Sequence, residues 1–152
     1  MLIATLFGVG LIPIAPGTCG SLVALPIAWA ISGRSGAFGL ALVLAVVFTV
    51  GCWAAGVVAK ASGVRDPGAV VIDEVCGQWL VLLATPLDPV AWGFAFLLFR
   101  LFDIWKPWPV RWVDQHVKGG LGIMLDDVAA AGYALLALWA LVAIGVTLGV
   151  RL

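Results

Sequence analysis

The sequence predicts an all-α protein: a multi-pass integral membrane helical bundle with short or broken helices and a polar site at the cytoplasmic face. Of its 152 residues, 64% are hydrophobic and only 11% are charged, whereas soluble domains carry about 25% charged residues. The mean hydropathy is +1.19, and two long stretches carry no charge at all. Too little polar material is present to cover a soluble monomer, so that class is set aside.

The two uncharged stretches are residues 37–59 and 128–150, and each has 23 residues. At 1.5 Å per residue each would extend about 34 Å as a helix, enough to cross a hydrocarbon core of about 30 Å. Both are predicted transmembrane helices. Between them, residues 75–84 and 90–105 are expected to form a hairpin of two short, partly embedded or tilted helices. The sequence T-P-L-D-P at 85–89 would break a single helix there.

The N-terminal region is broken by prolines and glycines. It is expected to form a short helix, a loop at residues 13–21 and a helix at about residues 22–32. The first residues lack a basic segment and a small-residue cleavage site, so no cleaved signal peptide is expected. The whole chain, residues 1–152, is interpreted as one membrane-embedded domain.

The eight basic and eight acidic residues are unevenly distributed. The net charge of zero gives no general attraction to nucleic acid, so no nucleic-acid partner is expected. If the helices alternate across the bilayer, only Arg34, Asp88 and Arg151 fall on one side and the other charges share the opposite side. That side holds six basic residues against two, which predicts that it faces the cytoplasm.

The three cysteines, Cys19, Cys52 and Cys76, form no C-x-x-C motif and have no histidine at metal-ligand spacing. They are interpreted as small apolar residues. The single histidine, His116, lies in a polar segment where it could donate a proton, but a lone loop histidine is more often a solvated side chain. Zinc or thiol chemistry is therefore not expected.

Charged side chains gather near helix ends in the second half of the chain. Asp73 and Glu74 open a hydrophobic helix, where they could simply complement the helix dipole. Arg100, Asp103 and Lys106 are spaced so that all three project to roughly one side of a helix. A salt-bridge ladder would explain them, but charges at the end of an embedded helix are costly without partners or a ligand. We therefore favour a functional role for them.

Arg111 and Asp114 repeat the three-residue spacing among Trp105, Trp108 and Trp112. These tryptophans are interpreted mainly as anchors at the membrane interface. The acidic residues on this side of the membrane offer the oxygen ligands that Mg²⁺ prefers, and the basic residues offer partners for phosphate oxygens.

The segment K-G-G-L-G-I-M-L-D-D runs from Lys118 to Asp127. Gly119 and Gly120 could turn backbone amides toward an anion, with Lys118 adding a positive charge. Asp126 and Asp127 stand side by side at the start of the last apolar stretch, where a pair of carboxylates is costly without a cation.

Four motifs together resemble one known family. They are P-x-x-P-G-T-x-G-S at residues 13–21, V-I-D-E-V-x-G-Q-W at 71–79, F-R-L-F-D-I-W-K-P-W-P-V-R-W-V-D at 99–114, and K-G-G-L-G-I-M-L-D-D at 118–127. In this order they closely resemble the bacterial phosphatidylglycerophosphatase A family, over nearly the whole chain. The resemblance implies an all-helical, Mg²⁺-dependent lipid phosphatase of the bacterial cytoplasmic (inner) membrane. It would convert phosphatidylglycerophosphate to phosphatidylglycerol and inorganic phosphate.

The acidic motif residues of the family correspond to residues of this chain, and we assign hypothetical roles to them and to their basic neighbours. The expected Mg²⁺ ligands are Asp73, Glu74, Asp103, Asp126 and Asp127. The expected catalytic residues are Arg100, Asp103, Lys106, Arg111 and Asp114. The expected phosphate-binding residues are Thr18, Ser21, Lys118, Gly119 and Gly120. An attacking water and an aspartyl nucleophile both remain open, as do the number of Mg²⁺ ions and the oligomeric state.

Two other classes of protein remain as alternatives. A small transporter or channel subunit would use clustered charges as an ion path, but here the charges gather at one interface instead of along the helices. A structural or assembly subunit would show no turnover. Phosphate release from the lipid separates both from the phosphatase.

Overall fold

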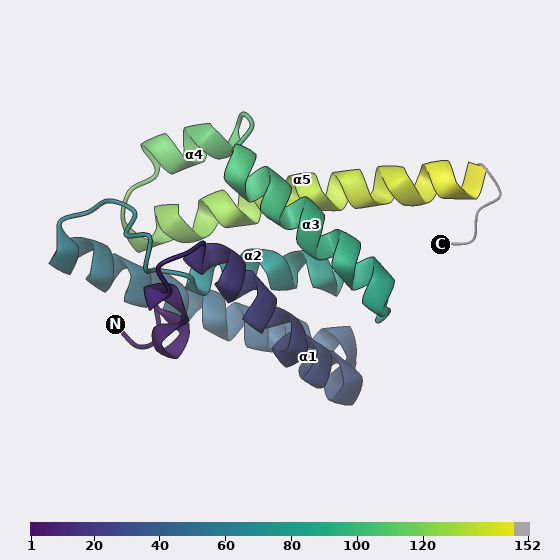
Figure 1. Ribbon diagram of the computed structural model, residues 1–152, viewed down its shortest axis with the longest axis horizontal. Helices are drawn as coiled ribbons and strands as arrows, with labels where there is room; N and C mark the ends of the chain where they lie inside the picture. The colour runs from purple at the N-terminus through teal and green to yellow at the C-terminus, as the bar shows by residue number, and fades with distance from the viewer. Residues whose placement is uncertain (148–152) are drawn as a thin grey trace.

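The computed structural model describes residues 1–147, and side chains up to residue 144. Its elements follow one another as a 3-10 helix and five α-helices: η1 (Leu6–Leu11), α1 (Pro16–Ser62), α2 (Ile72–Leu83), α3 (Pro89–Trp105), α4 (Val110–His116) and α5 (Gly119–Thr147). No strand occurs among the described residues, so the all-α prediction is confirmed. Figure 1 shows α5 running along the long axis of the molecule, with α3 crossing it at an angle.

Helix α1 reverses direction at Gly36, whose backbone is not helical (φ 63°, ψ −169°). It therefore consists of a first limb, residues 16–35, and a second limb, residues 37–62, which includes the helix predicted at 37–59 (Figure 1). The predicted loop at 13–21 is wrong beyond residue 15. Pro16 stands at the first helical position, where a missing N–H group costs no hydrogen bond, so the helix begins there.

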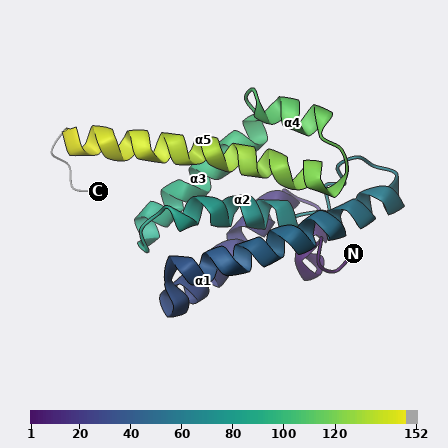
Figure 2. The ribbon, with the colours of Figure 1, turned by 180° about the vertical axis from the view of Figure 1, so that it is seen from behind.

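The predicted hairpin is confirmed in α2 and α3, which are joined by residues 84–88. Asp88 caps α3, because its Oδ1 accepts hydrogen bonds of 2.9 Å from the N–H groups of Val90 and Ala91. Helix α2 contacts α1, α3 and α5 and is buried on nearly all sides (Figure 2). At about 18 Å it is too short to cross a bilayer and forms the interior of the fold.

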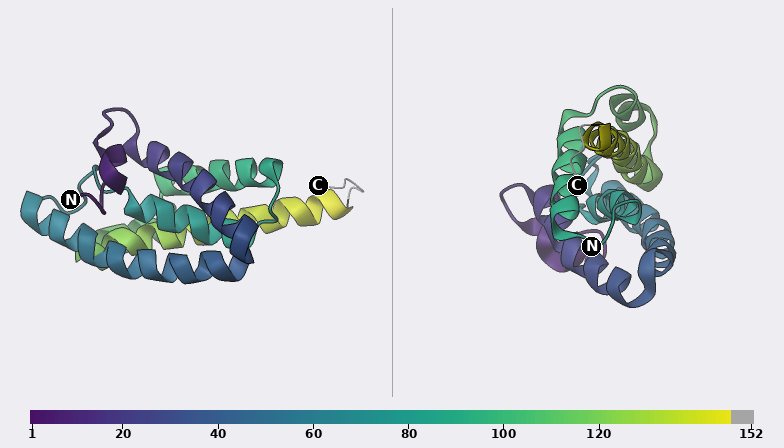
Figure 3. Two further views of the ribbon diagram at one scale, coloured as in Figure 1. Left: turned by 90° about the horizontal axis from the view of Figure 1, so that it is seen from below. Right: turned by 90° about the vertical axis from the view of Figure 1, so that its right-hand side faces the viewer.

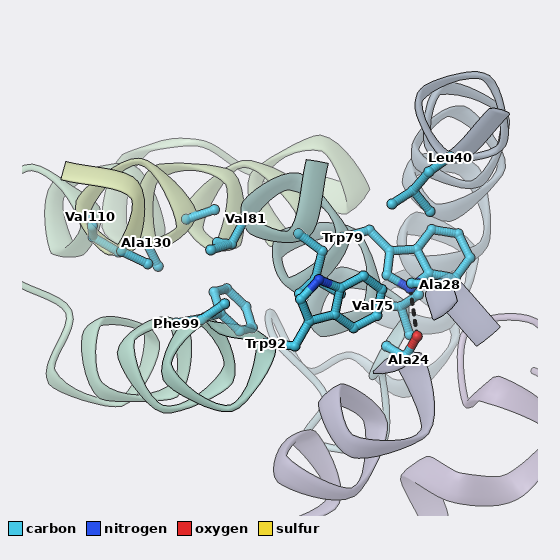
Figure 4. Packing of buried hydrophobic residues seen from close by; sticks show 14 residues of the cluster. Ala24, Ala28, Leu40, Val75, Trp79, Val81, Trp92, Phe99, Val110 and Ala130 are labelled. Atoms are coloured by element: carbon cyan, nitrogen blue, oxygen red, sulfur yellow. Dashed lines mark hydrogen bonds between the residues drawn. The ribbon is translucent and has the colours of Figure 1, made fainter. Parts of the chain in front are cut away.

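The hydrophobic core lies around α2. Trp79 on α2 donates a 2.9 Å hydrogen bond from Nε1 to the carbonyl oxygen of Ala24 on the first limb of α1 (Figure 4). Phe99 of α3 and Ala130 of α5 are fully buried in the same cluster. These contacts hold α2 in place against three other helices, and so position the acidic residues at its N-terminal end.

The charged segments meet at one end of the molecule. The loop at 63–71, helix α4 and the start of α5 lie at that end, whereas the reversal at Gly36 and the α2–α3 turn lie at the other (Figures 1 and 3). The sequence-based sorting placed Arg34 and Asp88 apart from the other charges. Their helix ends are indeed at this second end, and Arg151 lies outside the described residues.

Within the described part of the chain, two helices are long and apolar enough to cross a membrane: α1, with its reversal, and residues 119–144 of α5. Helix α5 begins nine residues before the predicted residue 128, and residues 148–150 of that prediction lie outside the described part of the chain. Large apolar side chains are exposed on both helices, including Trp53 and Leu136. Such a surface fits association with a membrane.

Candidate active site

The charged end of the molecule contains a cavity of about 410 Å³. Four helices and the loop after α1 contribute to it. The lining residues are Ala15, Pro16, Gly17, Thr18, Asp66, Gly68, Val70, Asp73, Glu74, Arg100, Asp103, Ile104, Lys106, Asp126 and Asp127. All five predicted metal ligands therefore line one cavity, although they come from three helices.

Three carboxylates converge at the cavity wall: Asp73 and Glu74 from the first turn of α2, and Asp127 from α5. One oxygen of each lies within 4.8 Å of the other two. Asp73 Oδ1, Glu74 Oε2 and Asp127 Oδ2 are buried and have no hydrogen-bond partner. We refer to these three residues as the acidic triad. Buried carboxylate oxygens without donors are costly, and hard cations such as Mg²⁺ are bound by such oxygens.

The pKa values of the two α2 carboxyls show the same cost. Burial, and then the neighbouring carboxylates of Glu74 and Asp127, raise the pKa of Asp73 well above its ordinary value. Burial also raises the pKa of Glu74, against the opposing influence of Arg100. A cation among these groups would relieve the repulsion that raises both values.

Arg100 on α3 connects the acidic triad to the rest of the cavity. Its Nη1 lies 2.5 Å from Oδ2 of Asp103 and 3.9 Å from Oε1 of Glu74. The same nitrogen lies 3.4 Å from the Ser21 hydroxyl. The Nε–H group of Arg100 is buried and has no acceptor. A donor is thus available beside the triad for an anionic ligand.

Lys106 ends α3 in the left-handed backbone region, with φ 47°. Its Nζ lies 2.6 Å from Oδ2 of Asp126 and 3.3 Å from Oδ1 of Asp114. Burial would lower the pKa of Lys106, but these two carboxylates hold it above its ordinary value. The ammonium group therefore stays charged and ties the end of α3 to α4 and α5.

These ion pairs divide the five predicted metal ligands into two groups. The acidic triad is short of partners, whereas Asp103 pairs with Arg100 and Asp126 pairs with Lys106. The sequence treated all five carboxylates alike, because spacing along the chain contains no information about which cation lies opposite each one.

Gly17 permits the close approach of α1 to the acidic triad. A Cβ atom at this position would lie 2.0 Å from Oε1 of Glu74 and 3.1 Å from a terminal nitrogen of Arg100. The first glycine of P-G-T-x-G-S, Gly17, is therefore required by the close packing of α1 against Glu74. No residue with a side chain could stand there without displacing the Glu74 carboxylate.

The predicted phosphate-binding residues differ in how close they lie to the cavity. Thr18 lines the cavity, and Ser21 contacts it through Arg100. Gly120 packs against α1, where a Cβ atom would lie 1.8 Å from the carbonyl oxygen of Cys52. Gly119 and Gly120 form the first turn of α5 and do not line the cavity, so their expected part in binding phosphate stays a prediction.

The remaining predicted residues lie at or beyond the edge of the cavity. Arg111 and Lys118 are exposed and do not line it. Asp114 takes part only through Lys106. The ring of His116 stacks on Trp112, and its Nδ1 lies 2.9 Å from the carbonyl oxygen of that residue. This contact is within α4, away from the acidic triad.

Sequence reasoning missed two residues near the site. Asp66, in the loop after α1, lines the cavity. Gln78 lies one turn after Glu74 on α2, is fully buried, and both of its side-chain polar atoms lack a hydrogen-bond partner. Gln78 belongs to the quoted motif V-I-D-E-V-x-G-Q-W, so a polar residue inside an otherwise apolar helix was the available signal.

Fold and site together define a helical protein with an apolar exterior and a charged cavity suited to a hard cation and an anionic ligand. The family model described as phosphatidylglycerophosphatase A matches residues 2–142. The chain belongs to the phosphatidylglycerophosphatase A family, which confirms the resemblance found in its motifs.

Relatives of known name span most of the chain. A phosphatidylglycerophosphatase A of Escherichia coli (strain K12) is 43% identical, with 85% of this chain and 75% of the relative aligned. One of Haemophilus influenzae is 40% identical over 92% of this chain and 86% of its own length. A Bacteroides thetaiotaomicron protein, named as a candidate phosphatidylinositol-3-phosphatase, is 43% identical over 88% of this chain and 87% of its own. No solved structure matches significantly.

Proposed function

We propose that this protein is a Mg²⁺-dependent phosphatidylglycerophosphatase of the bacterial inner membrane. It would hydrolyse phosphatidylglycerophosphate to phosphatidylglycerol and inorganic phosphate. Membership of the family and the names of two relatives support the reaction and the substrate. A transporter or channel subunit is not favoured, because eight of the charged residues line one cavity at one end of the fold instead of a path along the helices.

The observation that carries the proposal is the convergence of three carboxylates, each with one buried oxygen that has no hydrogen-bond partner, beside the Arg100 guanidinium group. The donor set is entirely oxygen, which fits Mg²⁺ and does not fit a soft metal. Asp73, Glu74 and Asp127 would hold the ion, and the roles of Asp103 and Asp126 as further ligands remain predictions. When bound, Mg²⁺ would supply positive charge that neutralises phosphate oxygens.

Arg100 is expected to bind the phosphate group instead of the metal ion. Arg100 would donate from its unpartnered Nε–H, and from its terminal nitrogens, to the oxygens of the phosphomonoester. Asp103 holds that guanidinium in place through its ion pair, and Ser21 does so through its hydroxyl. Stabilising negative charge that develops on phosphate oxygens is the main contribution a protein makes to phosphoryl transfer.

The proposed placement in the membrane rests on the contrast between the apolar helices and the charged cavity. The two candidate spanning helices would lie in the bilayer, and the charged cavity would lie at its cytoplasmic face. A diacyl lipid could then keep its chains in the bilayer while its phosphate reaches Arg100. Each limb of α1 would extend about 30 Å or more, which is enough for several passes through the membrane.

Phosphate release from phosphatidylglycerophosphate by the detergent-purified chain tests the reaction. We expect turnover with Mg²⁺ and its loss with EDTA, restored by adding Mg²⁺. Phosphatidylinositol 3-phosphate, assayed in parallel, tests the substrate named for the Bacteroides relative. No release from phosphatidylglycerophosphate with Mg²⁺ present, together with ion flux in liposomes, would overturn the proposal.

The metal site is tested without activity. Mg²⁺ should raise the midpoint of thermal unfolding of the wild type, by an amount set by its affinity; a hundredfold excess over Kd is worth about 2.7 kcal/mol. Asp127→Asn should abolish this shift. Asp88→Asn is the matched control, because Asp88 is a carboxylate at the opposite end and Asn also caps helices well. Equal shifts in both variants would contradict the assignment.

A further inference from the structure

Burial separates the charges at the charged end of the molecule by sign. The acidic residues are largely withdrawn from the surface: Asp73, Asp103, Asp126 and Asp127 are buried, and Glu74 and Asp114 are partly buried. Among the described residues at this end, Asp66 is the only exposed acidic residue. Most of the basic residues are exposed, and we call these the outer cations: Lys60, Arg65, Arg111 and Lys118. The outer surface is therefore net positive, although the whole chain has a net charge of zero.

The outer cations are not neutralised by carboxylates of the protein. In the part of the chain whose side chains are described, the ion pairs involve Arg100 and Lys106, and none involves an outer cation. Arg65 donates from Nη2 to the carbonyl oxygens of Asp114 and Val117, at 2.5 and 3.3 Å, so it contacts backbone instead of a carboxylate. An anionic partner could thus make charge-assisted hydrogen bonds here without breaking an internal ion pair.

Three of the outer cations surround the connection between α4 and α5. The contacts of Arg65 place its guanidinium beside the residue that precedes Lys118. Lys60 lies one turn beyond Gly56, and a Cβ atom on Gly56 would lie 3.3 Å from the backbone nitrogen of Gly120. The end of α1 therefore runs beside the start of α5, as Figure 1 shows, and brings these basic residues to one surface.

Exposed tryptophans indicate the level of this surface in a membrane. Trp105, Trp108 and Trp112 are all exposed, and they lie in the segment that ends α3 and forms α4. Arg111 lies in the same segment, next to Trp112. Indole side chains favour the level at which a bilayer meets water. The charged end of the molecule is therefore expected at the level of the lipid head groups.

The opposite end of the molecule has no such excess of positive charge. Arg34 and Asp88 are both exposed there, and within the described residues one charge offsets the other. This contrast goes beyond the count of basic residues that orients a membrane protein, because it depends on the carboxylates that the fold withdraws into the cavity.

We propose that the outer cations form a binding surface for the anionic head groups of lipids in the surrounding membrane. This inference rests on the proposed placement in a membrane and is independent of the phosphatase reaction. Clusters of about four to eight lysines and arginines beside a spanning helix attract anionic lipids. Because these residues surround a charged cavity, they would also raise the local concentration of an anionic lipid substrate near it.

Electron paramagnetic resonance of spin-labelled lipids measures this preference without an activity assay. The full chain is reconstituted in phosphatidylcholine vesicles, with spin-labelled phosphatidylserine or phosphatidylcholine as the probe. Phosphatidylserine is anionic but has no phosphomonoester, so the proposed reaction does not consume it. We expect phosphatidylserine to associate more strongly by about twofold or more at low salt. The preference should shrink in about 1 M salt, where exposed charges are screened.

Equal association of both lipids at low salt would overturn the proposal, and would favour a water-soluble acidic partner for this surface.

A triple variant tests which residues carry the preference. Lys60→Gln, Arg111→Gln and Lys118→Gln together remove three charges and keep the backbone contacts of Arg65, so most of the preference for phosphatidylserine should be lost. The matched control is Lys60→Arg, Arg111→Lys and Lys118→Arg, which keeps every charge and should keep the preference. Arg34→Gln, at the opposite end, should have no effect. Circular dichroism checks the helical content of each variant.

The cavity is the competing site for an anionic lipid. If Arg100→Gln abolishes the preference and the triple glutamine variant retains it, the lipid binds in the cavity and the proposal is wrong. Phosphate release measured on the same preparations separates this proposal from the proposed function. A wild type that prefers phosphatidylserine but releases no phosphate would contradict only the phosphatase. A wild type that releases phosphate without any lipid preference would contradict only the outer surface.

Discussion

The ammonium group of Lys106 lies 2.6 Å from Oδ2 of Asp126, twenty residues further along the chain. This ion pair joins the end of α3 to the buried part of α5, and Asp114 of α4 contacts the same ammonium at 3.3 Å. One side chain therefore fixes three helices around the charged cavity. It does so from a backbone conformation that side-chain-bearing residues seldom adopt, with φ 47°.

Two substitutions of Lys106 distinguish the contribution of its charge to stability from that of its backbone conformation. Lys106→Ala and Lys106→Gly should both lower the free energy of unfolding, by about 1–3 kcal/mol, because each leaves buried carboxylates unpaired at a partly exposed site. Glycine adopts the left-handed region freely, so Lys106→Gly should be the more stable of the two by about 1 kcal/mol. Thermal unfolding followed by circular dichroism measures both effects. Identical midpoints for the two variants would contradict the backbone argument.

Gly17→Ala should lower activity far more than it lowers helical content. The added methyl group would lie on Oε1 of Glu74 and must displace that carboxylate from the acidic triad. We expect a loss of about 1–3 kcal/mol in stability and a weaker dependence of the unfolding midpoint on Mg²⁺. Gly33→Ala is the control, because its Cβ position on the same limb is open. A Gly17→Ala protein with wild-type turnover would show that the approach is not required.

Two arginines that the sequence treated alike should behave differently. Arg100→Lys keeps the charge but loses the planar guanidinium with its free Nε–H group and its Nη1 contacts to Asp103 and the Ser21 hydroxyl, so kcat should fall by about 10²-fold or more. Arg111→Lys should remain within a few-fold of wild type, because Arg111 is exposed on α4 and does not line the cavity. Steady-state phosphate release compares them. A large loss for Arg111→Lys alone would reverse the assignment.

The metal-free protein should lose stability as the pH rises. The pKa of Asp73 is raised in the folded state by burial and by nearby carboxylates, so the unfolded chain ionises first. Above the ordinary aspartate pKa of about 4, the folded state therefore becomes progressively less favoured until Asp73 itself ionises. In EDTA, Asp73→Asn should flatten this dependence, whereas Asp88→Asn should not. Unfolding midpoints across the pH range measure it, and a wild-type stability that rises with pH would contradict the expectation.

Much of the architecture was accessible from the sequence because its causes are local. Uncharged stretches predicted the second limb of α1 and most of α5, and the proline pair around Asp88 predicted the turn between α2 and α3. The early start of α5 was missed, because Gly119 and Gly120 are ordinary turn signals when tertiary packing is not considered. In the fold, Gly120 instead lets α5 approach α1.

The motifs by themselves determined the family, the helical class and the end of the molecule at which the chemistry gathers, since helix periodicity and charge are properties of the chain. Only the tertiary structure decided which carboxylates have partners. It brought Asp73, Glu74 and Asp127 together, each with one buried oxygen that has no hydrogen-bond partner. It paired Asp103 with Arg100 and Asp126 with Lys106. That division depends on how α2, α3 and α5 pack against one another, and spacing along the sequence does not encode the distance between side chains on different helices.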